Sequence, residues 1–296
     1  MLEGEAPLPA PPVFSEELIA RCQSRNDYRP MLFEWYKYVG SLATVLSRVR
    51  RDSPALASMP AKNYAVLVGL INRCCRLMLA NIELSHAGLF GETTAIIDRC
   101  IFESATKLAW LCANDQARFR QYMADGLKTE LELRDNIKRN ISARGTGPVR
   151  IEVRMLESIK RYVDSSGLTE DEIRSERKLP DLATMIEALG QERLQYVVGQ
   201  KIGSHHIHGN WPSLITHYLD ELNGEYTPRD HDSPTHVNQY VFTPIIVLSS
   251  LRRFVECVVQ GTEEKTAFLD LIKSITEEII KIDREVVGQD FERAEI

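Results

Sequence analysis

The chain lacks the short motifs by which many enzymes are identified. Its 296 residues contain no glycine-rich phosphate loop, no Gly-x-Ser-x-Gly nucleophile elbow and no Cys-x-x-Cys pair. They also contain no uninterrupted apolar run of about 18 residues, the length that crosses a bilayer as a helix. The run from Ala65 to Ile71, for example, ends at Asn72. We therefore expect no membrane segment, and a function has to be sought in residues that the fold brings together.

Signals of secretion are missing as well. The sequence begins Met-Leu-Glu-Gly-Glu-Ala-Pro, which is acidic and proline-rich, unlike the basic and then apolar start of a signal peptide. The six cysteines are scattered through segments of helical pattern, and Cys74 and Cys75 are adjacent. This arrangement favours reduced, buried thiols over a disulfide framework. The sequence thus predicts a cytoplasmic protein.

A strong positive charge is also absent, although basic residues gather in one stretch. The formal net charge of −6 argues against a general nucleic-acid binder. Residues 118–161, however, contain eleven basic and six acidic residues. They form either two solvated helix faces or a basic surface that meets RNA or an acidic partner.

Alternating apolar and polar residues, the pattern of strands, are lacking, and nearly every segment has a helical period. Residues 30–51, for example, carry apolar side chains three and four positions apart. We predict an all-α protein: a multi-helix bundle with long amphipathic helices, forming a single domain over residues 13–296 after a flexible proline-rich leader at 1–12. The break at Gly145–Pro148 predicts a smaller helical insert at about 145–190. Within it, Thr169 followed by three acids predicts a helix start.

Two charged residues stand out in the apolar segment from Gly91 to Cys112, which should form a buried helix. Arg99 and Glu103 are four positions apart there and so lie on one helix face. Such a pair contributes only about 0.2–0.5 kcal/mol on a surface, while burying its charges is costly unless both are paired and hydrogen-bonded. We expect Arg99 and Glu103 either to hold helices together or to line a functional cleft.

The densest chemical cluster runs from Gly203 to Pro212. It places three of the seven histidines beside Ser204, near the end of a helix predicted over residues 191–208. In a regular α-helix four side chains would share one face: Tyr196, Gln200, Ser204 and His208. Gly209 fits the left-handed residue that ends a helix. His208 would then either interact with the helix dipole or act as a general acid or base.

A metal site is a separate possibility. Side chains of adjacent helical residues diverge by about 100°, so at most two of the clustered histidines could bind one ion. Glu83 and His86 have the spacing of di-iron bundles, but the second motif that those need is missing. A polar loop offers His231, Asp232 and His236. We expect neither a metal nor another cofactor, and the roles of four histidines stay open: His205, His206, His231 and His236.

Two motifs resemble those of a bacterial family, domain of unknown function 5677. One is Arg99-Cys-Ile-Phe-Glu103-x-x-x-Lys107-Leu-Ala-Trp110, similar to the family's helix with arginine and glutamate four apart. The other is Ser204-His-His-Ile-His208-Gly209, similar to its Ser-x-x-x-His ending. The resemblance covers about residues 30–260. It implies an all-helical fold and a site formed by Arg99, Glu103, Ser204 and His208, but no reaction.

A wider resemblance is to HEPN-type helical domains of bacterial toxin–antitoxin and antiphage systems. Many of these are metal-independent ribonucleases that use an arginine and a histidine four to six residues apart, often at a dimer interface. The chain departs from that pattern, because His208 has no arginine at this spacing. If the chemistry exists here, Arg99 must approach His208 from another helix.

Two hypotheses follow for what the protein does. In the first it is an RNA-cleaving or RNA-binding effector of bacterial defence or stress response, a metal-independent ribonuclease if it is an enzyme. His208 is then the acid or base, Arg99 the phosphate contact, and residues 118–161 the RNA-binding surface. In the second, the Arg-Glu-Ser-His cluster is a structural network in a non-enzymatic interaction or regulatory module. Both hypotheses include a homo-oligomer, such as a homodimer, or a helical protein partner.

Overall fold

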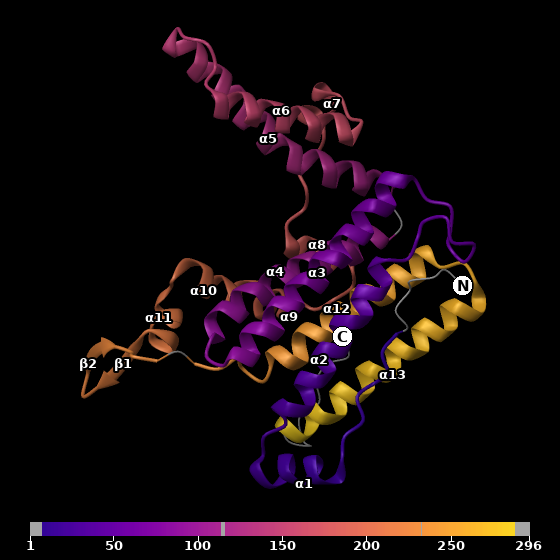
Figure 1. Cartoon of the computed structure of the whole chain (residues 1–296), viewed down its shortest axis with the longest axis vertical. Coiled ribbons are helices and arrows are strands. Elements are labelled where there is room, and N and C mark those ends of the chain that lie inside the picture. The colour runs from indigo at the N-terminus through magenta and orange to yellow at the C-terminus, as the bar shows by residue number, and fades with distance from the viewer. Residues whose placement is uncertain (1–7, 114–115, 232, 288–296) are drawn as a thin grey trace. The chain divides into compact units, whose positions relative to one another are not determined.

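The computed structural model describes residues 8–113, 116–231 and 233–287, and nearly all of their regular structure is helical (Figure 1). The prediction of an all-α fold is confirmed. The described strands form one antiparallel hairpin, β1 (Leu219–Leu222) with β2 (Glu225–Pro228). Most of the expected leader, residues 1–7, lies outside the described residues, and residues 8–15 have no regular structure.

The chain divides into two compact units. The first comprises residues 1–113 and 182–296, and the second comprises residues 114–181. The insert expected at about 145–190 thus falls partly in each unit. A single domain over residues 13–296 stays a prediction.

The core of the first unit is a group of long helices that pack side by side (Figure 1). They are α2 (Arg29–Ser47), α3 (Ala61–Ala87), α4 (Gly91–Cys112), α12 (Gln239–Val258) and α13 (Thr262–Val287), with the shorter α1 (Glu16–Arg25) before them. Their apolar stripes meet in side chains that are almost fully buried, among them Tyr36, Leu67, Ile101 and Phe254. As expected, α4 is largely buried, because it packs against α3 on one side and α12 on another.

Helix α3 departs from the expectation that the chain has no membrane-length segment. Over Ala61–His86 it includes an 18-residue stretch of mean hydropathy 1.5, long and apolar enough by length and composition to cross a membrane. The search for uninterrupted runs missed it because isolated polar residues such as Asn72 and Arg73 divide it. A core helix can have the same composition; 39% of this stretch is buried, with Leu67, Ile71 and Met78 fully so.

Short helices follow in the first unit and carry the histidine cluster. They are α8 (Leu182–Ala188), α9 (Arg193–Tyr196), the π-helix η1 (Val197–Ile202), α10 (Gly203–His208) and α11 (Trp211–His217). Gly209 ends α10 with a φ of 57°, the left-handed conformation that favours glycine, as predicted. Asn210 and Pro212 then begin α11 in a new direction.

The second unit consists of α5 (Gln116–Arg144), α6 (Arg150–Ser166) and α7 (Glu170–Ser175), of which α6 and α7 both pack against α5 (Figure 1). Leu127, Leu131 and Ile173 form its small core. Thr169 begins α7, because its hydroxyl accepts from the Glu172 amide while the Glu172 carboxylate accepts from the Thr169 amide. This confirms the predicted helix start.

Candidate functional site

A pocket of about 510 Å³ opens in the first unit where α4, η1, α10, α11 and the start of α12 meet. Its volume lies in the range of pockets for small ligands, about 300–1,000 Å³. Ala95, Val198, Ile202 and Phe242 line its apolar part, and charged or polar side chains project from the surrounding elements. A second pocket, of about 260 Å³, lies between α12 and α13 and contains none of the unpartnered buried polar atoms found among the described residues.

Glycines bring η1 and α10 close to α4 and so shape the pocket. A Cβ on Gly199 would lie 2.5 Å from the ring of Phe102, and one on Gly203 would lie 3.0 Å from the Cβ of Arg99. No larger residue fits at Gly199 without movement of the aromatic ring. These close approaches place Arg99 beside the segment that carries the histidines.

Arg99 lines the pocket, as a functional role for it would require. Its Nε is buried and has no hydrogen-bond partner. Unpartnered buried donors are rare in folded proteins, since each costs about 1–3 kcal/mol. No ion pair joins Arg99 to Glu103 among the described residues. The guanidinium group is therefore free to bind an anion that enters the pocket.

Asp98 precedes Arg99 on α4 and also lines the pocket. Its Oδ1 accepts a hydrogen bond of 2.8 Å from Asn81, while its Oδ2 is buried without a partner. Burial raises the pKa of Asp98 to about 8, and the nearby polar groups of Thr243, Asn81 and Tyr36 oppose this rise. The carboxyl group is thus largely protonated at neutral pH, and it can donate a proton from Oδ2.

The Asn81 amide that holds Asp98 is itself fixed. Its Nδ2 also donates to the hydroxyl of Tyr36 at 3.2 Å and to the carbonyl of Thr94 at 3.4 Å. The Thr94 hydroxyl contacts Thr235 and Gln239 at the start of the α12 segment. This network orients the Asp98 carboxyl group at the pocket wall.

His206 of α10 and His217 of α11 face each other in the pocket, with ring centroids 5.1 Å apart. The Nδ1 of His206 is buried without a hydrogen bond, 3.9 Å from a carboxylate oxygen of Glu92. Burial lowers the pKa of His206. The neighbouring His217 and His205 lower this pKa further, whereas the negative charge of Glu92 opposes the change. His206 is consequently neutral at physiological pH and can accept a proton. His217 contacts the hydroxyl of Ser233 at 3.0 Å through its Nδ1.

Glu92, at the start of α4, holds the segment that carries the histidines against this helix. Its carboxylate is buried and accepts hydrogen bonds from the hydroxyls of Ser213 and Tyr218, both on the α11 side of the site. A carboxylate near a helix N-terminus is also favoured by the helix dipole. Glu92 therefore fixes α11 to α4, and its negative charge opposes the lowering of the pKa of His206.

The other residues predicted for the site lie differently. Glu103 forms an ion pair of 2.6 Å with Lys107 along α4, and Ser204 donates to the carbonyl of Gln200 in the preceding η1. Neither lines the pocket. His208 is exposed at the end of α10 and does not line the pocket either. The structure thus brings only Arg99 of the four predicted residues to the pocket, and their catalytic roles stay predictions.

The π-helix explains part of this difference. A π turn includes one residue more than an α turn, so the four-residue spacing from Tyr196 and Gln200 to Ser204 does not preserve one face through η1. Lys201 accordingly lies over the ring of Tyr196, five positions earlier, at 5.8 Å. The prediction from sequence assumed a regular α-helix throughout this segment, and the π turn of η1 departs from that assumption.

Of the histidines whose role was open, His205, His206 and His236 line the pocket. His231 is exposed, and the Asp232 proposed beside it lies outside the described residues. No group of three or more potential metal ligands that could hold an ion occurs in the described part of the chain. Sequence reasoning missed Asp98, Glu92 and His217; an aspartate in the middle of an apolar helix was the available signal for the first.

Comparison with known families and proteins gives one match. A model described as a family of unknown function (DUF5677) matches residues 64–226, more than half of the chain. The matched region includes α4, η1, α10 and α11, which form most of the pocket, and also the second unit. No curated protein and no solved structure matches the chain.

Proposed function

The chain belongs to the family of unknown function DUF5677, and since that family supplies no reaction, we propose from the pocket that the protein binds RNA and cleaves it at a phosphodiester bond. One observation carries the proposal. Three buried polar atoms without partners, on Asp98, Arg99 and His206, belong to residues that line a single pocket. Since such atoms are destabilising when unsatisfied, their convergence indicates a ligand that satisfies all three.

The three groups have the properties that phosphodiester cleavage in RNA requires. Neutral His206 accepts the proton of the ribose 2′-OH, and the 2′-oxygen forms a bond to phosphorus. The bond from phosphorus to the 5′-oxygen breaks, and protonated Asp98 donates its proton to that oxygen. Arg99 stabilises the charge on the pentacovalent phosphate. The products are a 2′,3′-cyclic phosphate and a 5′-hydroxyl, and the apolar part of the pocket accommodates a base.

This proposal keeps Arg99 in the role expected from the sequence. It assigns the role of general base to His206 instead of His208. The proposed setting, a cytoplasmic effector of bacterial defence or stress response that acts as a homodimer, rests on the resemblance to HEPN-type domains. The partner remains RNA, with residues 118–161 as a further contact.

The test is cleavage of a labelled single-stranded RNA by the purified full chain. We expect products ending in 2′,3′-cyclic phosphate, and a loss of about 100-fold or more in rate for His206→Ala, in the range of general acid–base catalysis. Asp98→Asn and Arg99→Gln should also lose activity. His208→Ala, an exposed histidine of the same helix, is the matched control and should keep it. Absence of cleavage by the wild type, or equal loss in the control, would refute the proposal.

A specific observation favours a second candidate, a non-enzymatic interaction module. Large apolar side chains are exposed along residues 194–226, including Leu194 at 64%, Trp211 at 54% and Leu222 at 73%. Exposed apolar surface of this kind commonly marks a protein-binding site. Glu103 and Ser204, whose bonds are local, fit a structural role. If the protein is such a module, His206→Ala lowers the melting temperature, and neither the wild type nor the variant cleaves RNA.

A further inference from the structure

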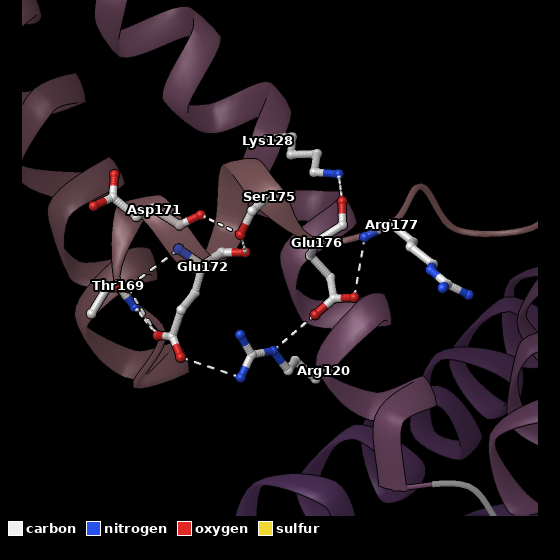
Figure 2. A network of polar contacts seen from close by, with 8 residues as sticks. All are labelled: Arg120, Lys128, Thr169, Asp171, Glu172, Ser175, Glu176 and Arg177. Carbon is white, nitrogen blue, oxygen red and sulfur yellow. Dashed lines mark hydrogen bonds and ion pairs between the residues drawn. The ribbon is translucent and has the colours of Figure 1, made fainter.

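The basic residues of α5 and of the start of α6 fall into two groups that differ in their partners. The first group lies on the first half of α5, where Glu172 of α7 and Glu176 just after it engage Arg120 and Lys128. Arg120 contacts Glu172 at 3.2 Å and Glu176 at 2.8 Å, and Lys128 donates to the carbonyl of Glu176, as Figure 2 shows. Residues 116–136 carry as many acids as bases, four of each. The first half of α5 therefore offers little uncompensated positive charge.

The same holds for the middle of α5. Arg134 binds the carboxylate of Glu170 with both terminal nitrogens, and Arg174 of α7 contacts Asp135 at 2.6 Å. Arginine–carboxylate pairs with two hydrogen bonds are among the stronger ion pairs. These bases serve to fasten α7 to α5.

The second group lies at the turn between α5 and α6. Residues 138–154 include five basic residues and a single acid, Glu152. That acid is already engaged, because it contacts Arg144 at 2.7 Å and accepts from the amide of Val149 at 2.9 Å. The turn thus carries an uncompensated positive charge on an exposed segment.

Two arginines of this turn have no partner. Arg150 and Arg154 are exposed, and neither makes a hydrogen bond or an ion pair within the described residues. They are four positions apart on α6 and so share one helix face. The opposite face of α6 is occupied, since Ile159 is buried and Val163 packs on the core of the unit.

We propose that this turn, residues 138–154, is an RNA-binding surface that contacts the phosphate backbone, with Arg150 and Arg154 as its main contacts. The choice of RNA rests on the function proposed above. Four of the five bases are arginine, whose planar guanidinium group matches phosphate geometry. A lipid surface fits less well, because the apolar face of α6 packs inward and the exposed apolar residues at the turn are Val149, Ile151 and Val153. Interfacial helices instead carry tryptophan, phenylalanine and leucine on a free face.

The experiment measures binding of a fluorescein-labelled 20-nucleotide poly(U) to the full chain by anisotropy, over a range of KCl concentrations. The variant is Arg150→Gln with Arg154→Gln. Its Kd should rise about tenfold or more at low salt. The slope of log K against log salt should become shallower by about 1.4, as each lost phosphate contact on a single strand contributes about 0.7.

The matched control is Arg252→Gln with Arg253→Gln, which removes the same charge from exposed arginines of α12 that pair with Glu256. It should leave both Kd and slope near the wild-type values. Equal weakening in the control, or an unchanged variant, would overturn the proposal. So would binding of phosphatidylserine vesicles, but not of RNA, that depends on Arg150 and Arg154.

Two further measurements separate this inference from the proposed catalysis. The turn variant should raise KM for RNA and keep kcat, whereas His206→Ala should lower kcat and bind poly(U) as the wild type does. If the wild type binds RNA through the turn without cleaving it, the catalytic proposal fails and the surface stands. If cleavage occurs and the turn variant binds normally, the surface fails and the catalytic proposal stands.

Discussion

Gly203 of α10 lies against the side chain of Arg99 on α4, so closely that a Cβ on the glycine would be 3.0 Å from the Cβ of Arg99 and 3.3 Å from its Cδ. The residue without a side chain thus defines where the guanidinium stem runs. The contact links the histidine cluster to the arginine helix, a link that neither motif contains by itself.

Gly203→Ala should therefore disturb Arg99 more than it disturbs the fold. The added methyl group displaces the arginine stem, and Arg99 leaves its position in the pocket; a shift of about 1 Å at a positioned group can cost roughly 100-fold in rate. Stability should fall by no more than about 1–3 kcal/mol, the usual cost of overpacking. RNA cleavage together with the melting temperature measures both effects.

The control for this change is Gly69→Ala on α3, where nothing lies within 4 Å of the added Cβ. It should raise stability by about 0.5–1 kcal/mol, because alanine is the better helix former, and keep activity. If Gly203→Ala cleaves RNA as fast as Gly69→Ala, the packing of Arg99 against α10 does not position a functional group.

The pH dependence of cleavage follows from two pKa shifts in the pocket. His206 must be neutral, and burial lowers its pKa below the usual 6.5, so activity should be lost only below that value. Asp98 must be protonated, and burial raises its pKa to about 8, so activity should fall as the pH rises through 8. We expect a bell-shaped profile of kcat/KM. A rate that increases steadily beyond pH 9 would contradict the role of Asp98.

Much of this fold could be predicted from the sequence because it depends on local rules. The three- and four-residue spacing of apolar side chains between residues 30 and 51 predicts α2, and the caps at Thr169 and Gly209 have the expected conformations. Each of these depends on neighbours within about four positions, and so the pattern itself contains the information.

The site could be predicted only in part, because its residues meet through packing. The apolar surroundings of Arg99 were sufficient to single it out, and the structure places it at the pocket. Asp98 acquires its importance from Asn81 on α3, and His206 from Glu92 on α4 and His217 on α11, so that each depends on residues of other helices. The π turn over Val197–Ile202 also changes which faces align, and no spacing rule indicates it.

The buried carboxyl group of Asp98 should lower the free energy of unfolding at high pH, and Asp98→Asn should remove that loss. Its pKa is about 8 in the folded protein against 3.8 ordinarily, so the folded state holds a proton that the unfolded chain releases between these values. Stability from this group is therefore full below about pH 3.8 and decreases as the pH rises to 8. Asp98→Asn has no such loss and should be more stable at pH 8 by a few kcal/mol, with little difference at pH 4.

Urea unfolding of the wild type and Asp98→Asn at the two pH values checks this. Asp52→Asn is the comparison, since Asp52 pairs with Arg50 and its hydrogen bonds with that residue lower its pKa. It should give no gain at pH 8. A less stable Asp98→Asn at pH 8 would mean that the carboxyl is ionised and well solvated in the folded protein.

Glu92 should control the titration of His206 independently of any activity. Its negative charge favours the protonated imidazole, which is why it opposes the effect of burial on the pKa of His206. Glu92→Gln removes that charge and keeps one of the two oxygens, so the amide can still accept from Ser213 or from Tyr218, but not from both. The pKa of His206 should then fall further below 6.5, which NMR titration of the imidazole protons measures. Glu103→Gln, on the same helix and outside the pocket, should leave it unchanged. An unchanged or higher pKa in Glu92→Gln would show that the two side chains do not interact in solution.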